Sequence, residues 1–193
     1  MCSMNTTIRR AIFLDFDGVL FDTVREAYAV TMITLGRFVR LEDVDFYSIH
    51  FEKFNEFRYL IGPPRNYYYL VQSIDRKIET LTNDIEIDYK NLLRKSADGE
   101  NHSFKKNFFH TRKRLREKDR EQWFALISSY DFLENVRGLL SEFRDRFFVI
   151  TTRDRDSVLD ILNLYNLNIL DSNIFAKKEY ALHNSKGNII QSL

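Results

Sequence analysis

Two aspartates, Asp15 and Asp17, stand immediately after a short apolar run at residues 11–14. A run of this kind is typical of a strand that is buried on both faces, as in a parallel sheet. In an open α/β sheet, ligands bind at the carboxyl ends of the strands, where both acids would lie. Two neighbouring carboxylates can bind a hard cation, or one can act as a nucleophile and the other as a general acid and base. Gly18 follows directly and lets the backbone turn sharply past the pair.

Two further segments have the composition of buried strands. Residues 147–150 form a second apolar run, which ends at Thr151, and residues 173–176 form a weaker third candidate. Sequence of helical character separates and follows these runs. Asp154 is the expected N-cap of a helix with an apolar stripe, and residues 132–143 are amphipathic in the same way. Alternating strands and helices predict an α/β fold with a parallel sheet and right-handed crossovers.

Residues 23–130 have a different character. They contain no convincing strand, and their helical stretches are 51–61, 66–80, 85–96 and 105–128. About a hundred helical residues are far more than a crossover connection needs. We therefore expect a large inserted, all-helical cap at 23–130, and a Rossmann-like core made of residues 1–22 and 131–193.

The composition limits the classes of partner. The 193-residue chain has 29 Lys and Arg against 28 Asp and Glu, so its net charge of +1 gives no reason to expect nucleic-acid or membrane binding. Its single cysteine, Cys2, has no partner for a disulfide within the chain, which is typical of a reducing compartment. No apolar run has the length of a membrane span, and the start of the chain does not resemble a signal peptide. A soluble, cytoplasmic protein is expected.

Several features of the predicted insertion admit two interpretations. Residues 105–120 contain eight basic residues and two acidic ones. A nucleic-acid surface is one interpretation, but the interleaved aromatic residues favour a helix with a solvated face. The tyrosines at 67–69 and the Phe-Tyr pair at 46–47 are interpreted as helix packing rather than as a base-stacking platform. Arg58 and Arg65 flank a Gly-Pro-Pro turn and are candidates for reaching a substrate from the cap.

Together, these features resemble the haloacid dehalogenase superfamily of phosphohydrolases. Residues 13–19 are similar to its first motif, an apolar strand followed by Asp-x-Asp-Gly-Val. The run at 147–150 followed by Thr151 resembles the second motif, and Lys186 at the start of a predicted helix resembles the third. The helical insertion at 23–130 is similar to the type 1 cap of this superfamily. The resemblance favours a catalytic site over the simpler interpretation of the two acids as turn or helix-cap residues.

The resemblance implies a phosphatase mechanism. Asp15 would attack phosphorus and form an aspartyl-phosphate, and Asp17 would protonate the leaving oxygen and then deprotonate the hydrolytic water. Thr151, through its hydroxyl and backbone N–H, and Thr152 would contact the phosphate. Lys186 would offset negative charge. The implied cofactor is Mg²⁺, held at Asp15 and at the backbone carbonyl of Asp17, because a carboxylate that attacks a phosphate faces like-charge repulsion. The implied substrate is a small phosphorylated molecule.

One family motif has no counterpart in this chain. The fourth motif is a strand ending in one or two acids that complete the Mg²⁺ site, and it follows the helix that carries the lysine. Only seven residues follow Lys186. Two alternatives therefore stand beside the phosphatase: a non-catalytic binding or regulatory relative, and a phosphomutase that shares the first half-reaction. For this chain we expect weak Mg²⁺ binding and a sheet edge that favours homo-oligomers. Arg153 is interpreted as a loop residue close enough to touch a substrate.

Overall fold

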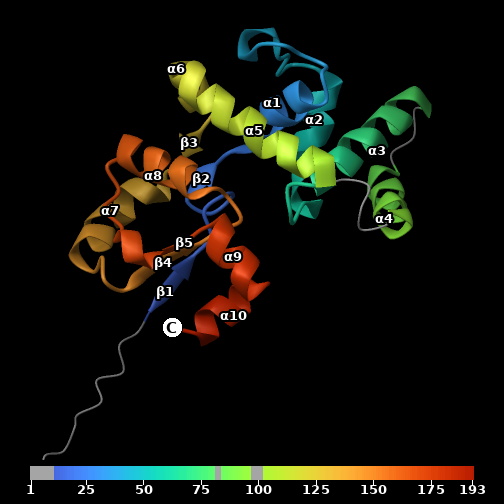
Figure 1. The fold of residues 1–193 in the computed structure, drawn as a ribbon. Coiled ribbons are helices and arrows are strands. Elements are labelled where there is room, and N and C mark those ends of the chain that lie inside the picture. The colour runs from blue at the N-terminus through green and yellow to red at the C-terminus, as the bar shows by residue number, and fades with distance from the viewer. Residues whose placement is uncertain (1–10, 81–83, 97–101) are drawn as a thin grey trace, which may run out of the picture. The chain divides into compact units, whose positions relative to one another are not determined.

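The computed structural model describes residues 11–80, 84–96 and 102–193. They form a mixed α/β structure that is mostly helical, and the chain divides into two compact units (Figure 1). The first unit consists of residues 1–22 and 129–193, and the second of residues 23–128. Cys2, on which the prediction of a reducing compartment depends, lies outside the described residues. No helix among the described residues is long and apolar enough to cross a membrane.

Three parallel strands form the sheet of the first unit. β1 (Ile12–Leu14), β4 (Phe147–Ile150) and β5 (Ile174–Phe175) pair in that order, with Phe13 opposite Phe148. All three strands predicted from the apolar runs are therefore confirmed. β4 lies between the other two strands, which explains why its sequence is apolar on both faces.

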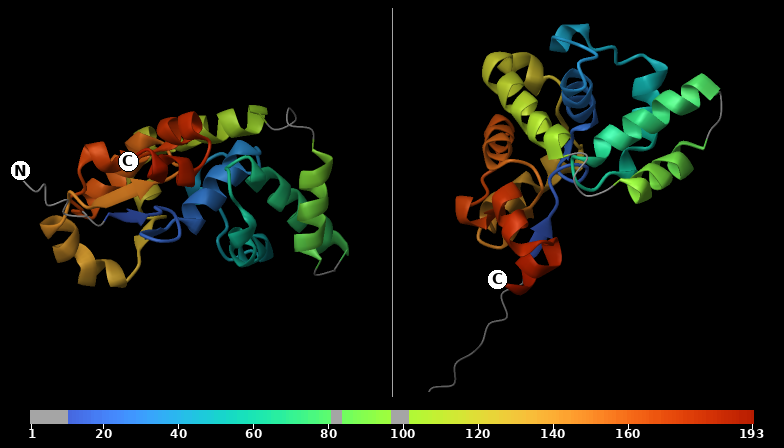
Figure 2. Two further views of the ribbon diagram at one scale, coloured as in Figure 1. Left: turned by 90° about the horizontal axis from the view of Figure 1, so that it is seen from below. Right: turned by 45° about the vertical axis from the view of Figure 1, so that its right-hand side comes forward.

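In the described part of this unit, helices follow the strands as predicted (Figure 2). They are α7 (Phe132–Glu142), α8 (Arg155–Leu164), α9 (Lys177–His183) and α10 (Lys186–Gln191), with a 3₁₀ turn, η3 (Asp171–Asn173), before β5. In the left view of Figure 2, α7 and the α9–α10 pair lie on opposite sides of the sheet. The predicted N-cap of α8 is confirmed, because the Asp154 carboxylate accepts the N–H of Ser157 at 3.0 Å.

The second unit is helical. Its elements are α1 (Val24–Thr34), η1 (Leu41–Asp43), α2 (Ile49–Glu56), η2 (Arg58–Leu60), α3 (Asn66–Thr80), α4 (Ile85–Lys95), α5 (His102–Lys118) and α6 (Arg120–Phe124). Its core is aromatic: the Tyr67 ring stacks between those of Phe54 and Phe108, with centroid distances of 5.4 and 5.5 Å. The packing role predicted for the tyrosine run is thus confirmed at Tyr67. The same prediction is wrong for Tyr47, which is 97% exposed.

The prediction of one continuous helix over 105–128 is also wrong. α5 ends at Lys118, Asp119 has a non-helical backbone, and α6 begins at Arg120. The turn at Asp119 allows Trp123 to be fully buried. Strand β3 (Ser128–Ser129) then forms a two-stranded sheet with β2 (Phe21–Asp22), so the end of the insertion contains strand residues that the sequence pattern did not indicate.

Candidate functional site

Asp15 and Asp17 lie in the loop that leaves β1. Gly18 has a φ of +82°, a left-handed conformation that favours glycine, and its N–H donates to the carbonyl of Phe21 at 2.8 Å. The N–H of Phe21 in turn donates to the carbonyl of Phe16 at 3.1 Å, and the Phe16 side chain is fully buried. The predicted sharp turn is confirmed, and it holds both acids at the carboxyl end of the sheet.

Lys186 contacts Asp15 directly. The Lys186 ammonium nitrogen, Nζ, lies 2.5 Å from Oδ2 of Asp15, while Oδ1 of Asp15 accepts the N–H of Phe16 at 2.8 Å. Asp15 is 39% exposed and Lys186 is 38% exposed, so this pair remains accessible to a ligand. Helix α10 positions the lysine as predicted: it begins after Ser185, whose hydroxyl caps the helix, and it is anchored by the fully buried Ile189.

Thr151 reaches the same edge of the sheet at the end of β4. Because β1 and β4 are parallel, with Leu14 opposite Val149, Thr151 and Asp15 both follow the carboxyl ends of adjacent strands. The predicted use of the Thr151 backbone N–H for phosphate is wrong, since this group already donates to the carbonyl of Phe175 at 2.9 Å. The Thr151 hydroxyl oxygen accepts a backbone N–H and keeps its own proton as a donor.

Asp17 forms an ion pair with Arg153, which was expected to be a loop residue close enough to touch a substrate. The Arg153 Nε and Nη2 lie 3.0 and 2.7 Å from Oδ1 of Asp17, and Nε lies 3.3 Å from Oδ2. The Arg153 side chain is completely buried, while Asp17 is 19% exposed. No sequence signal of burial accompanies Arg153, although its position two residues after Thr151 places it at the end of the central strand.

The remaining predicted site residues have different surroundings. Thr152 is half-buried in the loop after β4. Arg58 and Arg65 belong to the second unit and are not among the groups that the first unit brings together. The Arg58 guanidinium packs 5.0 Å from the Tyr67 ring centroid and donates to the carbonyl of Ile61, so it has a structural role within its own unit. Arg65 is exposed.

The carboxylates of the site do not by themselves fit Mg²⁺. Among the described residues, no group of three or more His, Cys, Asp or Glu is arranged to hold a metal ion. Asp15 contacts Lys186, and the Asp17 carboxylate contacts Arg153. A hard ion that requires octahedral oxygen ligands is poorly served by two carboxylates that already neutralise cations.

The basic segment at 105–120 does not form a uniformly solvated face. Arg112 is buried and pairs with Glu26, its Nε lying 2.7 Å from Oε1, and Arg116 is also buried. Other basic residues of α5, among them Arg114 and Lys118, are exposed. The predicted solvated helix is therefore correct for part of the segment only.

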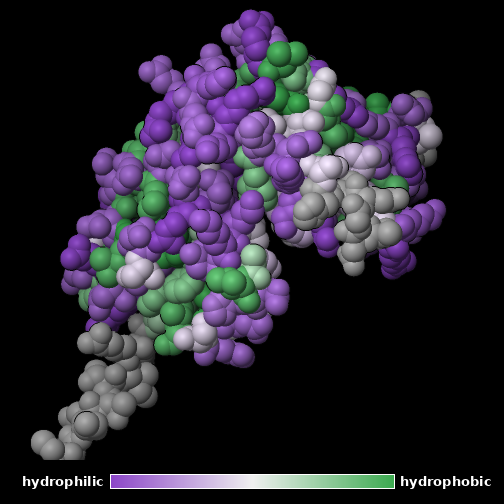
Figure 3. Space-filling model, in the orientation of Figure 1, coloured by the Kyte–Doolittle hydropathy of each residue, from purple (hydrophilic) through white to green (hydrophobic). Residues whose placement is uncertain are grey.

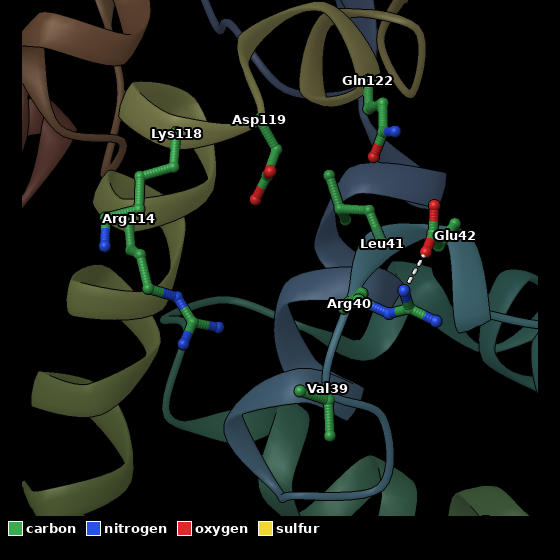
Figure 4. A pocket seen from close by; sticks show the side chains of 8 residues that line it. All are labelled: Val39, Arg40, Leu41, Glu42, Arg114, Lys118, Asp119 and Gln122. Atoms are coloured by element: carbon green, nitrogen blue, oxygen red, sulfur yellow. Dashed lines mark ion pairs between the residues drawn. The ribbon is translucent and has the colours of Figure 1, made fainter.

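A pocket of about 280 Å³ lies within the second unit, between α5, α6 and the segment around η1 (Figure 4). It is lined by Val39, Arg40, Leu41, Glu42, Arg114, Lys118, Asp119 and Gln122. Arg40 contacts Glu42 at 2.5 Å, so its charge is compensated inside the lining. This pocket shares no residue with the candidate site of the first unit.

Comparison of the chain with family models, curated proteins and solved structures gives no match.

Proposed function

We propose that this protein is a phosphohydrolase of the haloacid dehalogenase type, with a Rossmann-like core and a helical cap. It would hydrolyse a small phosphorylated molecule through an aspartyl-phosphate on Asp15. The main support is the 2.5 Å contact between Asp15 and Lys186, which come from opposite ends of the chain. The contact lies at the carboxyl end of a parallel sheet, where α/β proteins bind their ligands.

The residues support two successive steps. In the first, an oxygen of Asp15 bonds to phosphorus while the ester P–O bond breaks, and the leaving oxygen takes the proton of Asp17, which enters this step in its protonated form. In the second, water attacks phosphorus, its proton passes to Asp17, and the bond to Asp15 breaks, which releases phosphate. The ammonium of Lys186 and the hydroxyl of Thr151 contact the phosphoryl oxygens and offset their charge. Because the described carboxylates do not fit Mg²⁺, no step is assigned to a metal.

A binding protein without turnover is the second candidate function. The observation that favours it is the pairing of both acids with cations, Asp15 with Lys186 and Asp17 with Arg153. Such a site would recognise a phosphate group through Lys186 and Thr151 but would not transfer it. The phosphomutase alternative has no comparable support among the described contacts.

A phosphoenzyme experiment separates these two functions. The chain is incubated with acetyl phosphate, with and without Mg²⁺, and analysed by intact-mass and peptide mass spectrometry. We expect one added phosphoryl group on Asp15, and turnover of p-nitrophenyl phosphate. Asp15→Asn should lose both signals, whereas Asp145→Asn, at an exposed acid away from the site, should keep them.

The outcomes have distinct meanings. Binding of inorganic phosphate that depends on Lys186, without turnover or a phosphoenzyme, would support the binding protein. A phosphoryl group on a residue other than Asp15 would overturn the assignment of the nucleophile.

A further inference from the structure

Arg153 is the most deeply buried cation of the first unit's described site. Its side chain has no exposed surface, and its guanidinium carbon lies 5.7 Å from the centroid of the Phe16 ring. Burial of a guanidinium is costly unless a well-placed acceptor compensates its charge. Asp17 supplies that acceptor through the three contacts described above.

The backbone of Arg153 is fixed as firmly as its side chain. Its N–H donates to the hydroxyl oxygen of Thr151 at 3.1 Å, and its carbonyl accepts the N–H of Lys177 at 2.9 Å. Thr151 follows β4 and Lys177 follows β5, while Asp17 lies after β1. One residue therefore connects the carboxyl ends of all three strands of the sheet. An arginine held at both its backbone and its guanidinium cannot move without disturbing the carboxylate that it binds.

Arg153 contacts both carboxylate oxygens of Asp17, at unequal distances. Oδ1 receives the two shorter contacts, at 2.7 and 3.0 Å, and Oδ2 receives a longer one at 3.3 Å. A planar guanidinium fork fixes the orientation of a carboxylate, which the point charge of a lysine does not do. The fork thus holds Asp17 most closely through Oδ1 and fixes the plane of its carboxylate.

We propose that Arg153 is the positioning residue for Asp17, and that it orients the Asp17 carboxylate for proton exchange with the leaving group and with water. This inference rests on the proposed function. In this role Arg153 itself exchanges no proton. It acts through Asp17, so its effect on catalysis requires the Asp17 carboxylate.

A double-mutant cycle tests this dependence. Turnover of p-nitrophenyl phosphate is measured for the unmodified chain, Arg153→Lys, Asp17→Asn and the double variant. Arg153→Lys keeps the charge but loses the fork, so we expect kcat to fall by about tenfold or more. KM should change by less than about twofold, since Lys186 and Thr151 remain in place. In the Asp17→Asn background, Arg153→Lys should have less than about a twofold effect.

The control variant is Arg155→Lys. Arg155 lies two residues away and donates to the carbonyl of Ile174 at 2.7 Å, but it makes no described contact with Asp17. Its kcat should stay within about twofold of the unmodified chain. Circular dichroism and thermal unfolding are recorded for every variant. If Arg153→Lys does not fold, Arg153→Met replaces it in the same cycle, because a buried apolar side chain of similar length carries no uncompensated charge.

Three results would overturn the positioning role. One is an equal loss of kcat on Arg153→Lys in both backgrounds, and another is a loss that appears in KM alone. The third is an unchanged kcat. Failure of the proposed function gives a different result. The unmodified chain would then show neither turnover nor a phosphoryl group on Asp15. Arg153 would in that case have no catalytic role.

Discussion

The two aspartates of the candidate site differ most in the cations that they face. Asp15 pairs with Lys186 in a half-exposed contact, whereas Asp17 pairs with a completely buried Arg153. A half-exposed pair contributes at most about 1 kcal/mol, because solvent screens it. Removing the partner of a buried guanidinium costs more, about 3–5 kcal/mol, since the remaining charge is left uncompensated.

We therefore predict different stabilities for two substitutions that both remove activity. Asp15→Asn should abolish turnover with a free energy of unfolding within about 1 kcal/mol of the unmodified chain. Asp17→Asn should slow turnover at least about tenfold and also lower the free energy of unfolding, by more than Asp15→Asn does. Urea unfolding followed by circular dichroism measures both. Equal destabilisation by the two variants would contradict the asymmetry in burial.

At this scale, the sequence predicted the two acids and Lys186 better than it predicted Arg153. The apolar run and Gly18 indicated where Asp15 and Asp17 lie, because strand burial and a left-handed turn leave clear local patterns. No local sequence pattern indicates that Arg153 is buried. An arginine in a polar loop looks the same in sequence whether it is solvated or buried, and only the approach of β1 to β4 determines which it is.

At the scale of elements, a buried ion pair joins helices α1 and α5 of the second unit. Glu26 of α1 is fully buried and accepts from Arg112 of α5 at 2.7 and 3.0 Å. Trp123 of α6 also donates to Glu26, with its Nε1 at 3.2 Å from Oε1. Three helices thus converge on one carboxylate.

Loss of that carboxylate should destabilise the unit strongly. Glu26→Gln should lower the free energy of unfolding by about 3–5 kcal/mol, because it leaves the Arg112 charge buried without compensation. Removing both charges, in Glu26→Leu with Arg112→Met, should cost less than Glu26→Leu alone. Urea unfolding measures these differences, with Glu52→Gln on the exposed face of α2 as the matched control. A loss below about 1 kcal/mol for Glu26→Gln would contradict the prediction.

His50 of α2 makes the free energy of unfolding of the second unit depend on pH. Burial lowers the pKa of His50 below its usual value of 6.5; Asp75 opposes this shift and Arg37 adds to it. The unfolded chain therefore binds a proton at His50 at a higher pH than the folded chain does. The stability that this difference provides is complete above about pH 6.5 and is lost as the pH falls through the folded value.

We predict that His50→Gln reduces this loss of stability in acid. The fall in the free energy of unfolding between about pH 7.5 and about pH 5.5 should be smaller in the variant than in the unmodified chain. His110→Gln, at an exposed histidine of α5, serves as the control and should leave the fall unchanged. An identical pH dependence in all three chains would show that another group is responsible.

The apolar periodicity of the sequence predicted some helix boundaries correctly and missed others. The spans predicted for α3 and α4 agree closely with the structure, because each has a regular apolar stripe and a break beside it. The break between α5 and α6 was missed. Nothing in the local pattern around Asp119 ends a helix, and the turn follows from the burial of Trp123 against Glu26, which only the tertiary structure determines.

At the scale of the whole molecule, the chain divides into two compact units, with breaks after residues 22 and 128, whereas the expected insertion was 23–130. The mixed α/β class is confirmed. The described sheet has only three strands, so the Rossmann-like core remains a proposal. The extent of a sheet is hard to read from one sequence, because an edge strand and an exposed helix share the same polar character.

The described residues together predict weak binding of Mg²⁺. Both acids of the site already pair with cations, and no described cluster of three metal-binding side chains exists. A magnesium ion would have to displace Lys186 from Asp15 without gaining further carboxylates. Isothermal titration of the chain with MgCl₂ should therefore give a dissociation constant of about 1 mM or weaker. Micromolar binding would show that the chain holds acids near Asp15 that the described contacts do not include.

The open edge of the sheet predicts self-association. β1 pairs with β4 on one side, and no strand of the described residues pairs with its other side. Ile12 of β1 is 45% exposed, and apolar surface is visible near this strand in Figure 3. An exposed apolar edge strand offers unpaired backbone groups to a second copy of the chain.

Sedimentation velocity over a range of concentrations should therefore detect a dimer. Ile12→Lys should weaken it by about tenfold or more, because each copy would lose the burial of the exposed part of an isoleucine side chain, about 1 kcal/mol, and a lysine at an edge opposes strand pairing. Leu182→Lys is the matched control, since Leu182 is 81% exposed on α9 and lies outside the strands. This substitution should leave the dimer unchanged. A chain that stays monomeric at all concentrations, or a dimer that weakens equally in both variants, would show that β1 is not the contact between copies.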